Sequence, residues 1–353
     1  MNDSPVVPLE APDRMTSGAQ DDPAGVFDVP APEITVLLPS FNSRRCVVRA
    51  VRSVLAQTMD DFELMIVDDA STDGTPTLLA REFATDPRIR FIQLTENRGP
   101  AHARNVALRL ARGRWIALID ADDAWRPGRL ERLLQAGADA DAVFDNLAGA
   151  DAESGEETGP IFPQFPEGAL TIERLLATEL PDSGYNLGYL KPLIRREFLH
   201  RHALGYDESL RTGEDLVFYL SLLIAGARAK LVNSALYIYT TPVGHASRKN
   251  STHSNTTPRD EQVQAALERI SAQHGEQLSP QARRAIAKRI EYLRQIGPRA
   301  AFYHARRTGR YGVMAKLIAR ESSVRREVVA KLRRRIAAWR QRAVNPVSPS
   351  ERT

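Results

Sequence analysis

Short apolar strands alternate with amphipathic helices along residues 34–150, and no other feature of the sequence restricts the fold as strongly. Strands separated by helices need crossover connections, which are right-handed and place the strands in one parallel sheet. The sequence therefore predicts an α/β fold. The expected strands are Ile34–Pro39, Glu63–Asp68, Arg90–Leu94, Trp115–Ile119 and Asp141–Leu147. The expected helices cover about 44–57 and 75–84, run from Pro100 to an end at Gly113, and begin again at Pro127.

The regular alternation stops after residue 150. Residues 151–185 are rich in Gly, Pro and acidic residues, which predicts a loop or lid with one short helix near 170–179. Further along, the pattern predicts a strand at 187–194, a helix from Thr212 to Gly226, a last strand at Ala229–Tyr239 and a polar, mobile segment at 242–258.

Composition divides the chain into three parts. Residues 1–32 have little periodicity and read as a flexible leader, 33–245 as one α/β domain, and 259–345 as a helical basic extension. Residues 310–345 contain 11 Lys and Arg against two Glu, a net charge of +9. Because the whole chain carries +4, the remainder carries −5. The basic character therefore belongs to the tail and not to the α/β domain.

Cysteine content and hydropathy indicate the compartment. Cys46 is the only cysteine, so no intrachain disulfide can form, as is usual in a reducing cytoplasm. No apolar stretch approaches the roughly 20 residues that span a bilayer, and the features of a signal peptide are not apparent. We therefore expect a cytoplasmic protein.

Three carboxylates crowd the turn after the strand Trp115–Ile119, at Asp120, Asp122 and Asp123. Like charges this close repel one another, and burying them is costly unless a cation neutralises them. Mg²⁺ and Mn²⁺ prefer carboxylate, water and phosphate oxygens. In open α/β sheets, ligands bind outside the carboxyl ends of the strands, where this turn is expected. The turn is therefore a candidate metal-diphosphate site.

Other side chains are expected beside these acids. Asp69 follows the second strand, and Pro39, Phe41 and Asn42 lie at the end of the first. In a doubly wound sheet these strand ends converge on one crevice. The crevice would offer an aromatic face, a distal acid for hydrogen bonding and carboxylates for a metal-bound diphosphate, which is what a nucleotide diphosphate requires.

Five segments occur in an order that resembles a known family. They are Ile34–Asn42 (ITVLLPSFN), Ser53–Thr58 (SVLAQT), Phe62–Ser71 (FELMIVDDAS), Asn97–Asn105 (NRGPAHARN) and Ile119–Asp123 (IDADD). Together they resemble the family 2 inverting glycosyltransferases over about 33–245, and most of all bacterial exopolysaccharide enzymes of the succinoglycan type. The resemblance implies a GT-A fold, a Rossmann-like and mostly parallel sheet flanked by helices, here with a helical basic C-terminal extension.

The resemblance also implies roles for individual residues. The nucleotide-sugar-binding residues would be Pro39, Phe41, Asn42, Asp69, Asp120 and Asp122, with Asp122 near the ribose. Asp123 would be the main ligand of Mn²⁺ or Mg²⁺, and Asp215 in the pair Glu214–Asp215 would be the catalytic base. The implied reaction is a single displacement that moves a hexose from a nucleotide sugar to a lipid-linked saccharide. The expected donor is UDP-glucose.

Structural interpretations stand beside these roles. The acids of 119–123 could shape a turn and cap the next helix, and Asp69 could form a turn. Thr212–Asp215 has the form of a capping box, in which a side chain accepts a backbone N–H. His102, Arg104 and Asn105 could make structural hydrogen bonds or contact substrate.

The basic tail suggests a location for the protein. Val324, Val328, Leu332, Ile336, Trp339 and Ala343 recur at helical spacing among arginines. A basic amphipathic helix of this kind is typical of binding to a membrane surface, so we expect peripheral attachment to the inner face of the cytoplasmic membrane. A solvated helix, or one packed on the α/β domain or on another subunit, is the alternative.

Rival functions differ in their motifs. A sugar-1-phosphate nucleotidyltransferase would carry a glycine-rich basic loop after the first strand, where this chain has Pro39–Asn42. An arginine-rich tail also suggests nucleic-acid binding, but the acidic remainder of the chain argues against it, so no nucleic-acid partner is expected. A non-catalytic interaction module with the same fold is the remaining alternative.

Overall fold

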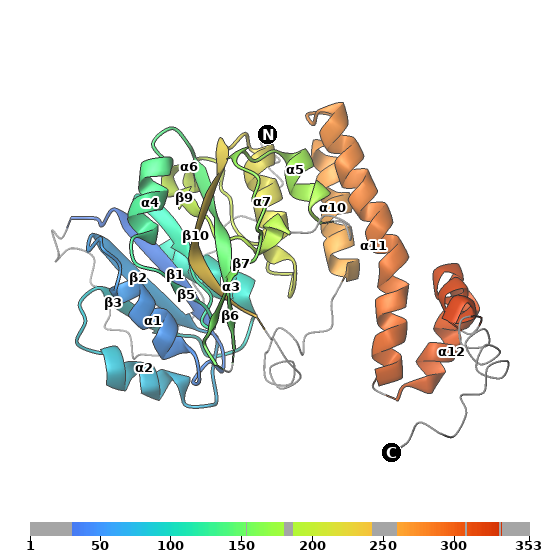
Figure 1. Ribbon diagram of the computed structural model, residues 1–353, viewed down its shortest axis with the longest axis horizontal. Helices are drawn as coiled ribbons and strands as arrows, with labels where there is room; N and C mark the ends of the chain where they lie inside the picture. Colours follow the sequence, from blue (N-terminus) through green and yellow to red (C-terminus); the bar gives the residue numbers. More distant parts are fainter. Residues whose placement is uncertain are drawn as a thin grey trace, which may run out of the picture.

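The computed structural model describes residues 30–152, 154–179, 186–241, 260–307, 309–331 and 333. The predictions for the leader up to residue 29, for the polar segment 242–258 and for the tail around Trp339 lie outside these residues. Within them, ten strands form one sheet with the order β3-β2-β1-β4-β9-β6-β10-β5, and β7 and β8 pair at its side. Figure 1 shows helices on both faces of this sheet.

One half of the sheet is parallel, as the sequence predicts. It consists of β1 (Ile34–Ser40), β2 (Phe62–Asp68), β3 (Ile89–Gln93) and β4 (Trp115–Leu118). Ile34 of β1 lies opposite Phe62 on one side and Trp115 on the other, so the three strands run in step. Because β1, β2 and β4 start together and run parallel, their carboxyl ends share one edge, although β4 is the shortest of the three.

The other half is mixed. It consists of β5 (Ala124–Trp125), β6 (Ala142–Asp151), β7 (Glu157–Pro160), β8 (Gly168–Ala169), β9 (Leu193–Arg195) and β10 (Ala229–Thr241). β9 runs antiparallel between β4 and β6, while β10 is parallel to β6. The α/β class is thus confirmed, with antiparallel strands that the alternation did not predict.

The strand predicted at 187–194 is mostly wrong. The segment forms the short 3-10 helix η1 (Leu187–Tyr189), and only Leu193 and Ile194 pair in β9. Asn186 begins η1 because its side chain accepts a hydrogen bond from the Gly188 N–H at 2.7 Å. Pro192 has no N–H to donate to a neighbouring strand, so pairing starts only after it.

Helices cover the parallel half on both faces. They are α1 (Val47–Leu55), α2 (Thr75–Phe83) and α3 (Pro100–Leu110), whereas α4 (Arg129–Ala136) packs on β6, β9 and β10 of the mixed half. The prediction that α3 ends at Gly113 is wrong, since Ala111 is already extended. Gly113 has another reason to be glycine, because a Cβ there would lie 2.3 Å from the Thr35 backbone nitrogen of β1.

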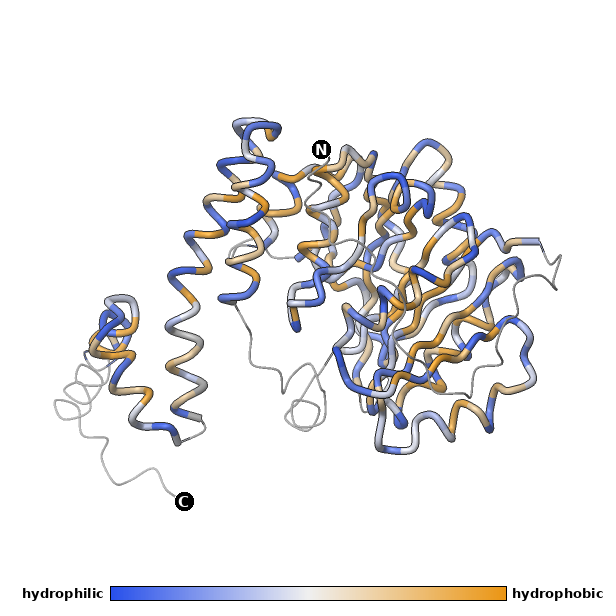
Figure 2. The backbone as a smooth tube through the Cα atoms, turned by 180° about the vertical axis from the view of Figure 1, so that it is seen from behind, coloured by the Kyte–Doolittle hydropathy of each residue, from blue (hydrophilic) through white to orange (hydrophobic). Residues whose placement is uncertain are grey.

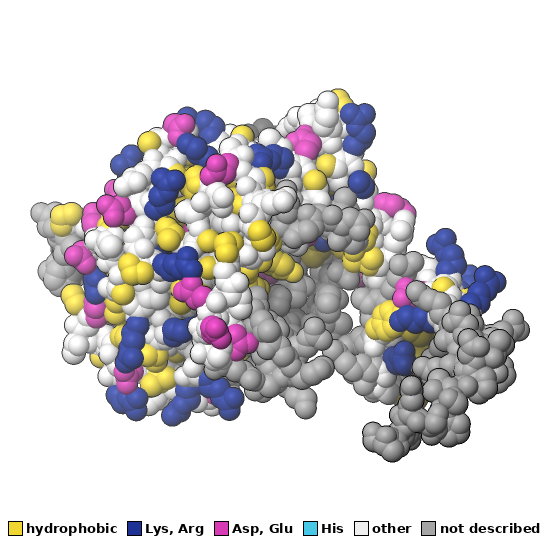
Figure 3. Space-filling view, in the orientation of Figure 1, with side chains coloured by type: hydrophobic (Ala, Val, Ile, Leu, Met, Phe, Trp, Pro, Cys, Tyr) yellow, Lys and Arg dark blue, Asp and Glu magenta, His cyan; other side chains and the backbone are white. Residues whose placement is uncertain are grey.

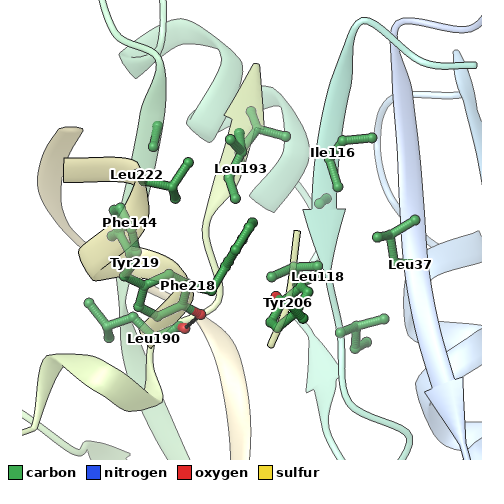
Figure 4. Close-up of a cluster of buried hydrophobic side chains, with 14 of the residues drawn as sticks. Leu37, Ile116, Leu118, Phe144, Leu190, Leu193, Tyr206, Phe218, Tyr219 and Leu222 are labelled. Atoms are coloured by element: carbon green, nitrogen blue, oxygen red, sulfur yellow. Dashed lines mark hydrogen bonds between the residues drawn. The ribbon is translucent and has the colours of Figure 1, made fainter. Parts of the chain in front are cut away.

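Hydrophobic residues concentrate along the strands and at their contacts with helices (Figure 2). Figure 4 shows the part of this core between β1, β4, β6 and α7 (Glu214–Ile224), with Leu37, Ile116 and Leu118 on one side and Phe144, Phe218 and Tyr219 on the other. The rings of Tyr206 and Phe218 stack with centroids 4.2 Å apart. This packing fixes the start of α7 against the carboxyl ends of the strands.

The C-terminal helices extend this body. Further helices are α5 (Ile172–Ala177), α6 (Arg196–Arg201), α10 (Asp260–His274), α11 (Pro280–Arg307) and α12 (Tyr311–Arg320), and residues 322–331 are helical as well. α10 packs on α7, and α11 packs on α5 and α10 before it leads away to α12 (Figure 1). None of the helices in the described part of the chain combines the length and apolar character needed to cross a membrane.

Candidate active site

Most of the acids expected at the site gather at one edge of the sheet, beyond the carboxyl ends of β1, β2 and β4. Register explains the gathering: Ser40, the last residue of β1, lies opposite Asp68, the last of β2. The next residue, Asp69, donates its N–H to the Ser40 carbonyl at 2.7 Å. The turn 119–123 follows β4, which pairs with the other side of β1. Adjacent strand ends therefore bring these acids together at one edge, as the sequence predicts.

Asp69 is buried and holds the loop that begins α3. Its Oδ1 accepts the Arg98 N–H at 2.9 Å, and its Oδ2 accepts the Gly99 N–H at 2.7 Å. Burial raises the pKa of this carboxyl, and the two hydrogen bonds oppose that rise. Gly99 has φ +95°, a conformation that favours glycine. Asp69 thus has a clear structural role at the position where contact with a nucleotide is expected.

Pro39, Phe41 and Asn42 lie beside this loop. Asn42 adopts φ +48°, and its side-chain Oδ1 accepts the Thr72 N–H at 2.9 Å. Its own N–H donates to Ser71 Oγ at 2.7 Å, so Asn42 joins the ends of β1 and β2. Pro39 and Phe41 are half-buried, which leaves part of each ring surface open to a ligand.

Asp123 is the most buried of the three acids after β4, with 1% of its surface exposed. Its Oδ2 accepts the Tyr237 hydroxyl at 2.6 Å, and its Oδ1 accepts the Thr240 N–H at 2.8 Å, both from β10. Burial, followed by the charges of Asp122 and Asp120, raises the pKa of Asp123 well above its ordinary value. An ionised Asp123 therefore needs a positive charge beside it.

Asp122 and Asp123 provide the donor atoms that a divalent cation needs. Asp122 is exposed, and its backbone carbonyl accepts a hydrogen bond from Arg49. Across the described residues, no three His, Cys, Asp or Glu side chains are arranged to hold a metal by themselves. Mg²⁺ typically takes one or two carboxylates and fills its other positions with water and substrate phosphates. The two carboxylates fit a metal that binds together with a diphosphate.

Asp120 points to two buried cations. Its Oδ1 lies 2.6 Å from Arg104 Nη2, and its Oδ2 lies 2.9 Å from Lys191 Nζ. Burial alone would raise the pKa of Asp120, but Lys191 and Arg104 hold it well below its ordinary value. Asp120 is thus favoured in its ionised form, and its two ion pairs anchor the acidic turn to α3 and to the segment before β9.

Asp215 lies in the first turn of α7 and joins the same cluster. Its Oδ2 is 2.5 Å from Lys191 Nζ, and its Oδ1 is 3.5 Å from Arg104 Nη1. Oδ1 is buried and has no hydrogen-bond partner. The capping-box alternative is wrong, since the cap is Gly213, at φ +76°, with no side-chain hydrogen bond. Asp215 is therefore held by cations, with one oxygen left to accept a proton.

His102 and Asn105 of the segment 97–105 make structural hydrogen bonds. His102 Nδ1 lies 2.8 Å from Glu208 Oε2, and the Asn105 side-chain amide donates to the Tyr206 carbonyl at 2.9 Å. Arg104, in contrast, bonds Asp120 of the acidic turn, and its Nη1 also donates to Glu214 Oε1 at 2.9 Å. The roles of His102, Arg104 and Asn105, which the sequence leaves open, therefore differ in the structure.

Two residues that hold the site were not singled out from the sequence. Lys191 is the single charge in an otherwise apolar run, Leu187–Ile194, and a buried lone charge of this kind is a signal that sequence inspection can use. Tyr237 of β10 gave no such signal, because tyrosine is common in strands. Its contact with Asp123 depends on β10 lying beside β5, which the sequence does not reveal.

Residues 35–198 match the family described as Glycosyl transferase family 2. The chain is 40% identical over 226 residues to the succinoglycan biosynthesis protein ExoO of Rhizobium meliloti, covering 62% of this chain and 63% of that protein. It is 34% identical to ExoU of the same organism, over 58% of this chain and 61% of that protein. It is 35% identical to the putative teichuronic acid biosynthesis glycosyltransferase TuaG of Bacillus subtilis, over 59% of this chain and 79% of that protein. The matches to ExoO and ExoU thus span less than two thirds of those proteins.

Solved structures confirm the fold. A crystal structure of S. aureus TarS 1–349 in complex with UDP-GlcNAc superposes with a TM-score of 0.55 at 18% identity, over 84% of this chain and 92% of that chain. The mannosyltransferase PcManGT from Pyrobaculum calidifontis, in complex with GDP-Man and Mn²⁺, superposes with a TM-score of 0.52 at 20% identity. The superposition covers 84% of this chain and 83% of that chain. The GT-A fold inferred from the sequence is therefore confirmed.

Proposed function

Because this chain belongs to glycosyl transferase family 2, we propose that it transfers a hexose from a nucleotide sugar, UDP-glucose, to a lipid-linked saccharide during exopolysaccharide biosynthesis. One observation carries the proposal. Asp215, whose buried Oδ1 has no hydrogen-bond partner, is linked through Lys191 to Asp120 of the acidic turn. A candidate base and a candidate diphosphate site are thereby held at a fixed separation.

The proposed chemistry is one displacement. Asp215 Oδ1 accepts the proton of an acceptor hydroxyl, whose oxygen forms a bond to the anomeric carbon as the bond from that carbon to the diphosphate breaks. Attack from the face opposite the nucleotide inverts the anomeric configuration. Asp123, with Asp122, would hold Mn²⁺ or Mg²⁺, which when bound neutralises charge on the departing diphosphate. Asp69, Pro39 and Phe41 lie where the nucleoside would bind.

The C-terminal helices support a membrane location for the acceptor. Three large apolar residues are exposed here. The exposed fraction is 73% for Tyr311 and 44% for Val313, both in α12, and 45% for Val329. A hollow of about 580 Å³ beside Val329 is lined by Arg325, Arg326, Ala330 and Arg333. Figure 3 shows Lys and Arg beside hydrophobic side chains in this region. Basic and apolar groups on one surface favour anionic lipid, so we propose peripheral attachment to the cytoplasmic membrane.

A product assay tests the proposal. We expect the protein, supplied with Mn²⁺, UDP-[¹⁴C]glucose and anionic vesicles that carry lipid-linked saccharides from an exopolysaccharide-producing bacterium, to release UDP and place label in the lipid fraction. The protein should also sediment with the anionic vesicles but not with neutral ones. Release of pyrophosphate when UTP and glucose-1-phosphate replace UDP-glucose would instead indicate a nucleotidyltransferase, and vesicle-independent sedimentation would contradict the membrane proposal.

A further inference from the structure

Lys191 is buried between two carboxylates that come from separate parts of the fold. Its side chain is 5% exposed, and its Nζ contacts Asp215 Oδ2 of α7 at 2.5 Å and Asp120 Oδ2 after β4 at 2.9 Å. Its backbone is fixed as well, because the Lys191 carbonyl accepts a hydrogen bond from Arg129. The preceding carbonyl, of Leu190, accepts the Tyr219 hydroxyl at 2.5 Å. The ammonium group therefore occupies a defined position between the two carboxylates.

We propose that Lys191 is a positioning residue that orients Asp215 toward the acceptor hydroxyl and fixes its distance from the donor's diphosphate. The inference rests on the proposed transfer reaction. Lys191 engages Oδ2 of Asp215, whereas Oδ1 has no hydrogen-bond partner and only a longer ion pair with Arg104 Nη1, at 3.5 Å, so we assign Oδ1 to the incoming hydroxyl. The same ammonium group binds Asp120, which belongs to the turn that carries Asp123.

The charges around Asp215 explain why a lysine is needed in addition to Arg104. Asp215 faces Lys191 from the segment before β9, Arg104 from α3, Asp120 after β4 and Glu214 on its own helix. Three carboxylates thus share two cations, and removing one cation would leave buried negative charges poorly compensated. The buried phenols of Tyr206 and Tyr219 also face Asp215, and burial keeps their pKa values well above the ordinary value. They therefore supply no charge of their own.

Substituting Lys191→Met, which keeps the length of the side chain without its charge, tests the proposal. We expect kcat for transfer from UDP-glucose to fall by about 10²-fold, the loss that a misplacement of roughly 1 Å can cause. The Kd for UDP with Mn²⁺ should stay within about 2-fold, since the nucleotide contacts remain. Lys230→Met provides the matched control, since Lys230 forms a partly exposed pair with Asp139 and should keep wild-type kcat.

The double variant Lys191→Met/Asp215→Asn separates positioning from general loss of structure. If Lys191 acts through Asp215, the double variant is no slower than Asp215→Asn alone. Equal loss of kcat and UDP binding, additive losses in the double variant, or wild-type kcat in Lys191→Met would each overturn the proposal. Lys191→Gln, which keeps a hydrogen-bond donor, is measured alongside, and failure of both variants to fold would make Lys191 a structural residue. A wild-type protein that transfers no sugar would instead overturn the proposed function.

Discussion

Asp215→Asn lowers kcat for sugar transfer by about 10²- to 10⁴-fold, the contribution usual for a positioned general base. Asparagine keeps the shape of the side chain but cannot accept the proton of the acceptor hydroxyl. Binding of UDP with Mn²⁺ persists, because Asp215 lies on α7 and pairs with Lys191 and Arg104 and not with Asp122 or Asp123. Steady-state rates with the labelled donor, together with calorimetric titration of UDP, measure both effects.

Glu214→Gln is the matched control for this substitution. Glu214 is adjacent in sequence, similarly buried, and bonded to Arg104 at 2.9 Å. Of this pair of acids, only Asp215 contacts Lys191. We expect Glu214→Gln to lose much less of kcat than Asp215→Asn. If Glu214→Gln were the inactive variant and Asp215→Asn the active one, the base would be misassigned, although the fold and the donor site would stand.

Arg129→Met lowers the free energy of unfolding by about 3–5 kcal/mol, the cost of leaving a buried charge without its partner. Arg129 and Asp145 are both completely buried and joined by two hydrogen bonds, Nε to Oδ2 at 3.0 Å and Nη2 to Oδ1 at 2.7 Å. Burial raises the pKa of Asp145, and Arg129 opposes that rise. The guanidinium also lies 4.7 Å from the Trp125 ring centre and 5.0 Å from that of Tyr237. Urea unfolding measures the loss.

The double variant Arg129→Met/Asp145→Leu tests whether the unpaired carboxylate causes this loss. Replacing both members of a buried ion pair by apolar residues is often neutral or stabilising, so we expect the double variant to recover most of the lost stability. A single variant that loses less than about 1 kcal/mol would show that Asp145 finds another partner or takes up a proton at little cost. A double variant as unstable as the single one would assign the loss to packing against Trp125 and Tyr237.

The parallel half of the sheet could be predicted closely because each of its strands is an apolar run bounded by turn residues. The predicted Ile34–Pro39 became β1 one residue longer, and Trp115–Ile119 became β4 one residue shorter. β9 could not be predicted, because three residues after Pro192 carry no periodic signal and their pairing with β4 and β6 is set by tertiary contacts. β6 continues past the predicted Leu147 to Asp151 because β7 and β10 pair with its small residues.

The site, like the sheet, could be predicted only in part from the sequence. The acids after β2 and β4 could be placed at one edge because parallel strand ends share an edge, and the link from Asp215 to Lys191 could not. That link joins residues 24 positions apart and depends on β9 turning back between β4 and β6. Likewise, the hydrogen bond from Tyr237 to Asp123 spans 114 positions and exists because β10 lies beside the acidic turn.

Calorimetric titration of UDP, with and without Mn²⁺, into the wild type and Asp123→Asn tests most directly that this edge of the sheet binds the donor. We predict that the wild type binds UDP and that Mn²⁺ tightens the binding, because Asp123 and the diphosphate share the cation. Asp123→Asn should bind UDP with the same affinity whether or not Mn²⁺ is present. A wild type that binds no UDP in either condition, or a variant that keeps the full effect of Mn²⁺, would contradict the account.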